Sequence, residues 1–201
     1  TTNLTLFAKS MHWNFGLCPF SRTFVMKKKR PQTELNRIDI LRRCYRMMAM
    51  GAWDAISVSD LEKGIDRTRG AIFYFNKNKE ELFVNMIDEL FLPVFKLSKD
   101  DRTTLKRCSA KNFFAIYKTP FERVCNDLRI NYRVQNPSHD LFNILIQAQR
   151  HYKDFRQVIN AELQSEIDFI GSIIGSNRAV EIDIHKIYTN SAGRIFLDSF
   201  S

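Results

Sequence analysis

Apolar residues recur at helical spacing near the start of the chain. In the segment 33–50 they fall three and four positions apart, which places their side chains on one face of a helix: Ile38, Leu41, Tyr45 and Met48. Thr33 is a candidate N-cap for this helix, and Gly51 stands where a glycine ends many helices. The pattern therefore predicts a first amphipathic helix over 33–50.

Three shorter apolar segments follow, and each is preceded by residues that cap helices. Ser57 and Ser59 are candidate caps of a short helix that ends at Ile65, with Leu61 and Ile65 inward. A turn at Asp66-Arg67 comes next. Thr68 is a candidate cap for a helix over 68–75, with Ile72 and Phe75 inward, and Asn78 is a candidate cap for a helix over 79–92. Glu80 and Glu81 lie in the first turn of that last helix, where the helix dipole favours acids.

The remainder of the chain carries the same helical period. A long helix is predicted from Phe155 to about Gly175, and a last one from about Asp183. With only 7 Gly and 5 Pro in 201 residues, the chain lacks the turn signals of a β sandwich. We predict an all-α fold.

Charge and chemistry narrow the function classes. The formal net charge of +9 suits a polyanionic partner, although it is weak evidence alone. The 4 cysteines and 4 histidines are scattered, without metal-site spacing, and no phosphate-binding glycine loop or nucleophile motif occurs. No apolar run approaches about 18 residues. We expect a cytoplasmic protein with no cofactor, no metal, no membrane span and no enzymatic activity.

The first 25 residues differ from the rest, being rich in Phe and Thr and nearly free of charge. They are either a poorly structured extension or a region upstream of the true start at Met26, and the second interpretation is favoured. A basic arm follows directly: Lys27, Lys28, Lys29 and Arg30. Domain boundaries are placed at 1–25, 26–78 and 79–201.

The segments 57–65 and 68–75 have the spacing of a helix-turn-helix. In that motif the second helix presents its N-terminal residues to base edges in the major groove. Thr68, Arg69 and Ala71 face outward in this arrangement, and Gly70 permits close approach to a partner helix or to phosphates. Lys77 and Lys79 lie at the next helix N-terminus, where ammonium and free N–H groups suit a phosphate.

With these pieces in place, residues 34–91 resemble the DNA-binding domain of the TetR family of bacterial transcriptional regulators. The matching residues keep the family's spacing without gaps: Ile40-Leu41, Gly51, Ser57 to Leu61, Thr68 to Tyr74, and Asn78 to Leu82. Three positions depart from the family pattern. Asp66 replaces the turn glycine, Phe73 replaces a phosphate-bonding tyrosine, and Phe75-Asn76 shifts an aromatic by one position.

The resemblance implies a three-helix DNA-binding domain followed by a helical ligand and dimerisation domain. It also implies a four-helix bundle across the dimer, built from the last two helices of each subunit. Because the chain stops at Ser201, within what looks like the first of those two helices, we expect a truncated C-terminus.

We therefore predict a transcriptional regulator that binds double-stranded DNA as a homodimer, a repressor released by an unknown small-molecule effector. The predicted DNA-contacting residues are Ser57, Ser59, Thr68, Arg69, Gly70, Ala71, Phe73, Tyr74, Lys77 and Lys79, with the arm Lys27, Lys28, Lys29 and Arg30. The predicted effector contacts are Phe113, Phe114, Tyr117 and Phe142, although aromatic stripes at helical spacing are more often core.

Two other classes stay open. A helical protein–protein adaptor of the same fold would have lost sequence-specific DNA binding. The departures from the family pattern at Asp66 and Phe73 are the features that favour this alternative. An all-α enzyme would need a cluster of ionisable residues in the second domain. The nearest group, Arg150-His151 with Asp154, is explained by one turn of ordinary surface residues.

Overall fold

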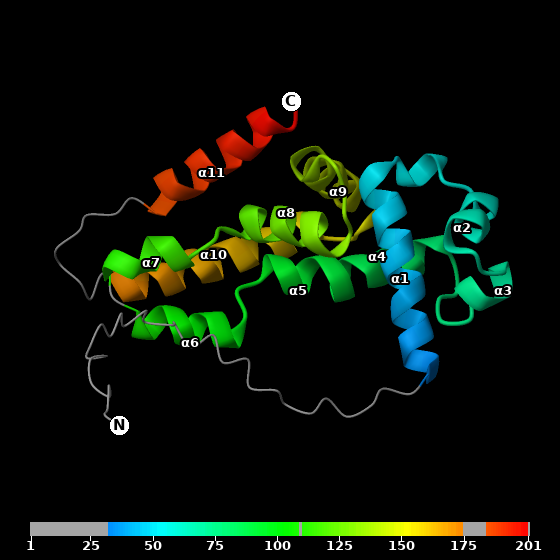
Figure 1. Ribbon diagram of the computed structural model, residues 1–201, viewed down its shortest axis with the longest axis horizontal. Helices are drawn as coiled ribbons and strands as arrows, with labels where there is room; N and C mark the ends of the chain where they lie inside the picture. The colour runs from blue at the N-terminus through cyan, green and yellow to red at the C-terminus, as the bar shows by residue number, and fades with distance from the viewer. Residues whose placement is uncertain (1–31, 109, 175–183, 201) are drawn as a thin grey trace, which may run out of the picture. The chain divides into compact units, whose positions relative to one another are not determined.

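A computed structural model describes residues 32–108, 110–174 and 184–200, apart from the side chains of Ala110, Lys111, Phe114, Ile174, Ile184 and His185. The described residues form helices, turns and loops and contain no strand, so the predicted all-α class is confirmed (Figure 1). The helices are α1 Gln32–Met50, α2 Val58–Ile65, α3 Arg69–Ile72, α4 Lys79–Met86, α5 Leu92–Phe95, α6 Lys99–Arg107, α7 Ala110–Ile116, α8 Pro120–Asn131, α9 Pro137–His151, α10 Phe155–Ile174 and α11 Ile184–Asp198.

In the first half, the predicted helix boundaries need correction at α1, at α3 and at the α4–α5 helix. Thr33 is not an N-cap, because α1 already begins at Gln32 and Thr33 lies inside it. The helix predicted over 79–92 continues to Phe95, because a π-helical segment, η2 at Ile87–Phe91, joins α4 to α5. Widening the hydrogen-bond ladder there lets the helix continue through Pro93, which has no N–H to donate.

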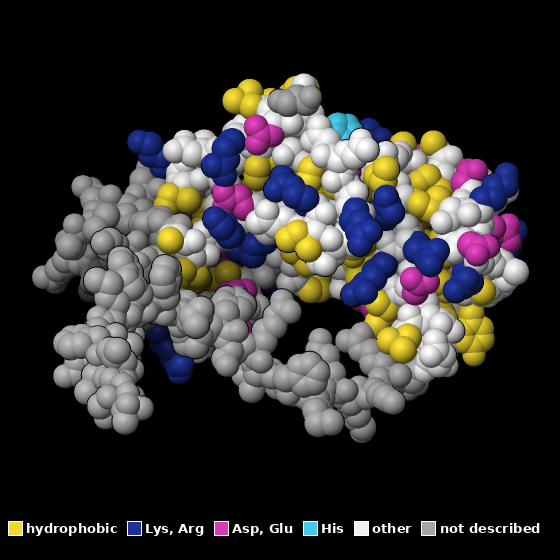
Figure 2. Space-filling view, viewed as in Figure 1, with side chains coloured by type: hydrophobic (Ala, Val, Ile, Leu, Met, Phe, Trp, Pro, Cys, Tyr) yellow, Lys and Arg dark blue, Asp and Glu magenta, His cyan; other side chains and the backbone are white. Residues whose placement is uncertain are grey.

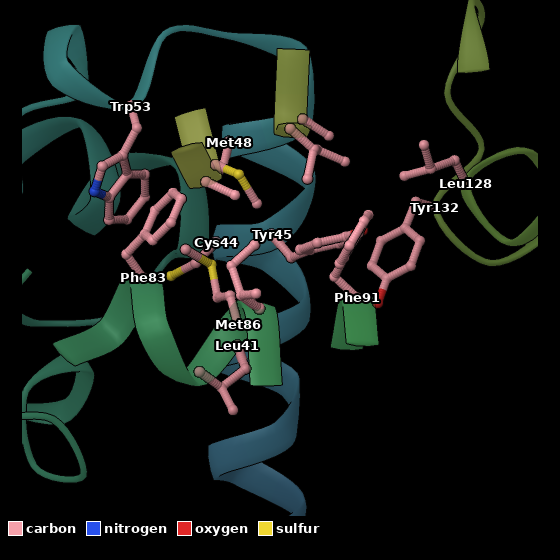
Figure 3. Close-up of a cluster of buried hydrophobic side chains, with 14 of the residues drawn as sticks. Leu41, Cys44, Tyr45, Met48, Trp53, Phe83, Met86, Phe91, Leu128 and Tyr132 are labelled. Carbon is pink, nitrogen blue, oxygen red and sulfur yellow. The ribbon is translucent and has the colours of Figure 1, made fainter. Parts of the chain in front are cut away.

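The main core is built by the amphipathic face of α1. Figure 3 shows Leu41, Cys44, Tyr45 and Met48 of α1 against Phe83, Met86 and Phe91 of the α4–α5 helix, with Leu128 and Tyr132 from the α8 region. All nine side chains are buried. The apolar face of α1 predicted from the sequence is therefore the face that packs in the core. α4 shares this core with α1, α8 and α9. The domain boundary predicted at residue 78 is not decided by this packing and stays a prediction.

A second apolar cluster lies farther along the chain. Its buried members are Leu97, Leu105, Phe113, Tyr117, Ile170 and Tyr188, drawn from α6, α7, α10 and α11 and from the segment before α6. Within it, Glu166 is 2% exposed and accepts hydrogen bonds from Tyr117 and Tyr188, while Arg123 forms a salt bridge with it at 2.7 Å. A buried carboxylate needs such partners to offset the loss of hydration.

Candidate nucleic-acid interface

The first helix of the predicted motif, α2, is fixed at its N-terminus by a capping box. Ser57 Oγ accepts the backbone N–H of Asp60 at 3.2 Å, and Asp60 Oδ2 accepts the backbone N–H of Ser57 at 2.9 Å. Hydrogen bonds from the side chain and backbone of Ser57 lower the pKa of Asp60. Ser57 and Ser59 are both exposed, and Ser57, not Ser59, is the cap.

Packing against α1 sets the position of α2. Leu61 and Ile65 are fully buried, as predicted. A Cβ at Gly64 would lie 2.6 Å from the sulfur of Met47, so a larger residue there would push the flexible end of the Met47 side chain aside. Arg43 of α1 donates from Nη1 to the Ile65 carbonyl at 3.3 Å, which satisfies a backbone acceptor at the C-terminal end of α2.

The turn between α2 and α3 is made by Asp66 in a left-handed conformation, with φ 56° and ψ 52°. This is the backbone state that a turn glycine supplies easily. Aspartate adopts it more readily than most other residues, which explains why the turn survives the replacement. The backbone N–H groups of Asp66 and Arg67 both donate to the Glu62 carbonyl.

The predicted reading helix, α3, is a single turn. Thr68 caps it as expected, since its Oγ1 accepts the backbone N–H of Ala71 at 3.3 Å, and Ile72 is fully buried beneath it. The helix ends at Ile72, so the predicted span 68–75 is too long. Phe73, rather than Phe75, packs against the core; Phe75 instead lies edge-on to Tyr74 at 4.8 Å between ring centroids.

The outward side chains of this turn are polar, basic or aromatic. Thr68, Arg69 and Gly70 are exposed, Ala71 is partly exposed, and Tyr74 is 75% exposed. A Cβ on Gly70 would meet no atom within 4 Å, so packing within the described residues does not require a glycine there. Phe73 is partly buried, so only part of its ring is open to a partner.

An acidic residue that the sequence did not single out reaches this turn. Glu62 of α2 accepts the backbone N–H of Arg69 through Oε1 at 2.6 Å. It thereby occupies one of the free N–H groups at the start of α3, a position where negative charge is favourable. A phosphate placed there would meet the Glu62 carboxylate.

The two lysines near α4 have different surroundings. Lys77 is exposed, and its backbone N–H donates to Glu81 Oε2 at 2.5 Å. Lys79 is half-buried: its Nζ donates to the Trp53 carbonyl at 2.5 Å and lies 4.8 Å from the centroid of the Trp53 ring. Asn78 caps α4 as predicted, accepting the Glu81 N–H at 2.8 Å. Lys77 is thus the lysine left open to a phosphate.

Two amide side chains of α9 hold the end of α1, a contact that no sequence pattern indicated. Asn143 Nδ2 donates to the carbonyls of Ala49 and Gly51, each at 2.9 Å. Gln147 Nε2 donates to Met48 and Gly51 carbonyls at 3.1 Å, while its Oε1 accepts the Trp53 N–H. Gly51 follows α1 as expected but does not have a positive φ, so it does not close the helix as a left-handed glycine would. The two amides instead bond the last carbonyls of α1.

The predicted effector residues fall into separate places. Phe113 and Tyr117 stack at 5.5 Å in the second cluster, and Tyr117 lines a pocket of about 210 Å³ with Leu97, Leu105 and Arg123. Phe142 instead packs against the main core and edge-on to Phe196. The side chain of Phe114 and the basic arm Lys27, Lys28, Lys29 and Arg30 lie outside the described residues.

Among the described residues, no group of three or more His, Cys, Asp or Glu side chains is placed to hold a metal ion. No described helix combines the length and the apolar character that crossing a bilayer requires. Comparisons with protein-family models, with curated proteins and with solved structures found no match to this chain.

Proposed function

We propose that this chain is a transcriptional regulator that binds double-stranded DNA through α2 and α3, with the domain arrangement of the TetR family. The observation that carries the proposal is the pair of short helices joined through left-handed Asp66. It combines a buried face of Leu61, Ile65 and Ile72 with an outward α3 N-terminus at Arg69. A short, firmly packed pair of this kind is what a major-groove reader needs, because the base contacts require a fixed helix end.

The contacts we propose differ in kind. Arg69 is the candidate for base edges, because a guanidinium matches the two acceptors of guanine in the major groove. Tyr74 and Lys77 are exposed and would bond phosphates, which position the protein without reading sequence. Thr68 is given the role of helix cap, because the Glu62 carboxylate lies at the same helix start. Lys79 is given a supporting role, since its ammonium group already contacts Trp53.

Glu62 adds selectivity to this arrangement. Its carboxylate at the start of α3 opposes close approach of any phosphate. Non-specific attraction to the DNA backbone is weakened there, whereas a base-edge donor such as the cytosine amino group is tolerated.

Two such helices are needed for a palindromic operator. We propose a homodimer, supported by apolar side chains exposed on and just after α11: Phe196 at 50%, Leu197 at 69% and Phe200 at 76%. Apolar groups exposed together mark association surfaces more often than isolated ones do. The two α3 helices would then lie about 34–36 Å apart, one turn of the duplex.

Regulation by a small-molecule effector is part of the same proposal. The pocket beside Tyr117, of about 210 Å³, would admit only a very small effector, and Arg123 at its wall is paired with buried Glu166. A ligand that competed for Arg123 would disturb the salt bridge that joins α8 to α10. The alternative, an adaptor without sequence-specific DNA binding, is favoured by one observation, the absence of a phenolic donor at Phe73.

The test is selection of random duplex DNA on the chain, repeated across a salt series. We expect enrichment of a palindrome and its loss in Arg69→Ala. Arg107→Ala is the matched control, because Arg107 is an exposed arginine on α6. Binding that only follows salt, with no enriched site, would contradict the regulator and favour the adaptor.

A further inference from the structure

A hollow on the surface between α1, the α4–α5 helix and α8 is lined by four arginines and three acidic residues, together with apolar and neutral side chains. Its volume is about 870 Å³, within the range of small-molecule sites. Arg42, Arg43 and Arg46 of α1 form one side, and Arg133, just past α8, also lines it. Figure 2 shows Lys and Arg side chains gathered over α1 in the same region. This hollow is separate from the outward face of α3.

The acidic groups in the hollow are already engaged. Asp39 forms a salt bridge with Arg43 at 3.1 Å, and Glu89 forms one with Arg37 at 2.6 Å. Burial raises the pKa of Asp127, while a hydrogen bond from Asn131 and the nearby positive charge of Arg42 oppose that rise. Within the part of the chain that the structure describes, Arg42, Arg46 and Arg133 form no salt bridge.

The spacing of two of these arginines is unfavourable in the free protein. Arg42 and Arg46 are four residues apart and therefore neighbours on the surface of α1. Like charges at this spacing destabilise a helix, and they are relieved when an anion binds between them.

Arg133 occupies a position where glycine is usual. It follows the C-cap of α8 with φ 52°, and the next N–H, of Val134, donates back to the Leu128 carbonyl at 3.3 Å. An arginine adopts this positive φ only with strain, and residues strained in this way cluster at functional sites.

We propose that this hollow binds a phosphorylated small molecule of nucleotide size. Arg42, Arg46 and Arg133 would hold the phosphate oxygens, because guanidinium groups bind them in paired hydrogen bonds. Leu90, Pro93 and Val94 of the α4–α5 helix form an apolar wall for the organic body of the ligand. The curvature and size of the hollow favour a compact polyanion over a duplex.

This site does not depend on the proposed function, but it adjoins the parts that carry it. Arg43 lines the hollow and also donates to the Ile65 carbonyl at the end of α2. A bound ligand would therefore touch α1, α5, α8 and a residue that holds the helix-turn-helix pair.

The first test is calorimetric titration of the full chain with three magnesium-free probes: ATP, tripolyphosphate and adenosine. We expect one saturable site that prefers ATP over tripolyphosphate, with adenosine weakest. The double variant Arg42→Ala/Arg46→Ala should weaken ATP by roughly tenfold or more, and Arg156→Ala, an exposed arginine on α10, by less than about twofold. Equal affinity for ATP and tripolyphosphate would contradict the role of the apolar wall.

A second variant separates binding from folding. Arg133→Gly relieves the left-handed strain, so it should raise Tm while weakening ATP by about threefold or more. Asp154→Gly is the matched control, because Asp154 also has a positive φ, of 58°, but does not line the hollow. It should raise Tm and leave ATP binding unchanged.

Either of two results would overturn the proposal. One is no saturable ATP binding up to about 1 mM. The other is ATP binding whose affinity is unchanged in both the double variant and Arg133→Gly. In that case, a double variant with weaker affinity for duplex DNA would assign these arginines to the DNA contact. If the chain binds ATP but enriches no sequence among random duplexes, the proposed function is rejected and the ATP site is supported.

Discussion

The side-chain carboxylate of Glu62 accepts the backbone N–H of Arg69 at 2.6 Å. The helix proposed to read DNA therefore begins beside a negative charge supplied by its own partner helix. This contact stabilises α3 and, in the proposed complex, keeps the DNA backbone away from the helix end.

Replacing Glu62 with Gln keeps a hydrogen-bond acceptor and removes the charge. We expect affinity for a random duplex to rise by roughly fivefold at low salt, the equivalent of about 1 kcal/mol of repulsion between unit charges near 4 Å in water. Fluorescence anisotropy with a random duplex measures this. The control Asp100→Asn, at an exposed acid on α6, should change affinity by less than about twofold. An unchanged affinity in Glu62→Gln would show that DNA does not approach α3.

Lys77 and Lys79 form a matched pair for separating a phosphate contact from a structural role. Lys77→Ala should reduce the slope of log affinity against log salt by about 0.9, the loss of one phosphate contact, with little change in stability. Lys79→Ala should leave that slope nearly unchanged. It should lower the free energy of unfolding by about 1–2 kcal/mol, because it removes the hydrogen bond and the ring contact to Trp53. A reduced salt slope in Lys79→Ala, with unchanged stability, would show that Lys79 contacts a phosphate.

Gln147 is predicted to be among the most sensitive polar positions of α9. Gln147→Ala leaves the Trp53 N–H without a partner in the interior and removes one of the two amide donors to the Met48 and Gly51 carbonyls, which keep Asn143. The free energy of unfolding should fall by about 1–3 kcal/mol. Urea denaturation measures this. Gln149→Ala, on the exposed side of the same helix, should lower it by less than about 0.5 kcal/mol. Similar values for the two variants would mean that the Gln147 amide contributes little.

Stability at high pH should depend on Cys44. Burial raises the pKa of its thiol to about 12, from an ordinary value of 9.0. The unfolded chain therefore loses this proton at lower pH than the folded chain does, so the contribution is complete below pH 9 and is lost as pH rises toward 12. Urea denaturation between pH 8 and about pH 10.5 should show a falling free energy of unfolding, and a smaller fall in Cys44→Ala. Equal falls would show that Cys44 is not the group responsible.

Local rules predicted the helix starts within residues 57–82. Ser57, Thr68 and Asn78 each accept an N–H from three residues farther along, so the residues that make the cap are neighbours in the sequence. Asp66 takes the turn conformation for an equally local reason, because its own side chain tolerates a positive φ. Features of this range are readable before any tertiary contact is known.

The surroundings of the same residues could not be predicted in this way. Arg69 meets Glu62 across 7 residues, Lys79 meets Trp53 across 26, and Gln147 meets Trp53 across 94. Each contact depends on how helices pack, which hydrophobic period alone does not determine. For the same reason, the sequence could not show that Phe142 packs in a different cluster from Phe113 and Tyr117. A helical stripe of apolar residues indicates that a side chain is buried, but not which cluster it joins.

The most direct measurement of the central claim is a hydroxyl-radical footprint of the chain on duplex DNA, compared between wild type and Arg69→Ala. The account predicts two protected half-sites whose centres lie about 10 base pairs apart, one for each α3 of a dimer. It also predicts that Arg69→Ala abolishes the pattern, while Arg107→Ala keeps it. Uniform protection without half-sites, or a pattern unchanged in Arg69→Ala, would contradict DNA reading by α3.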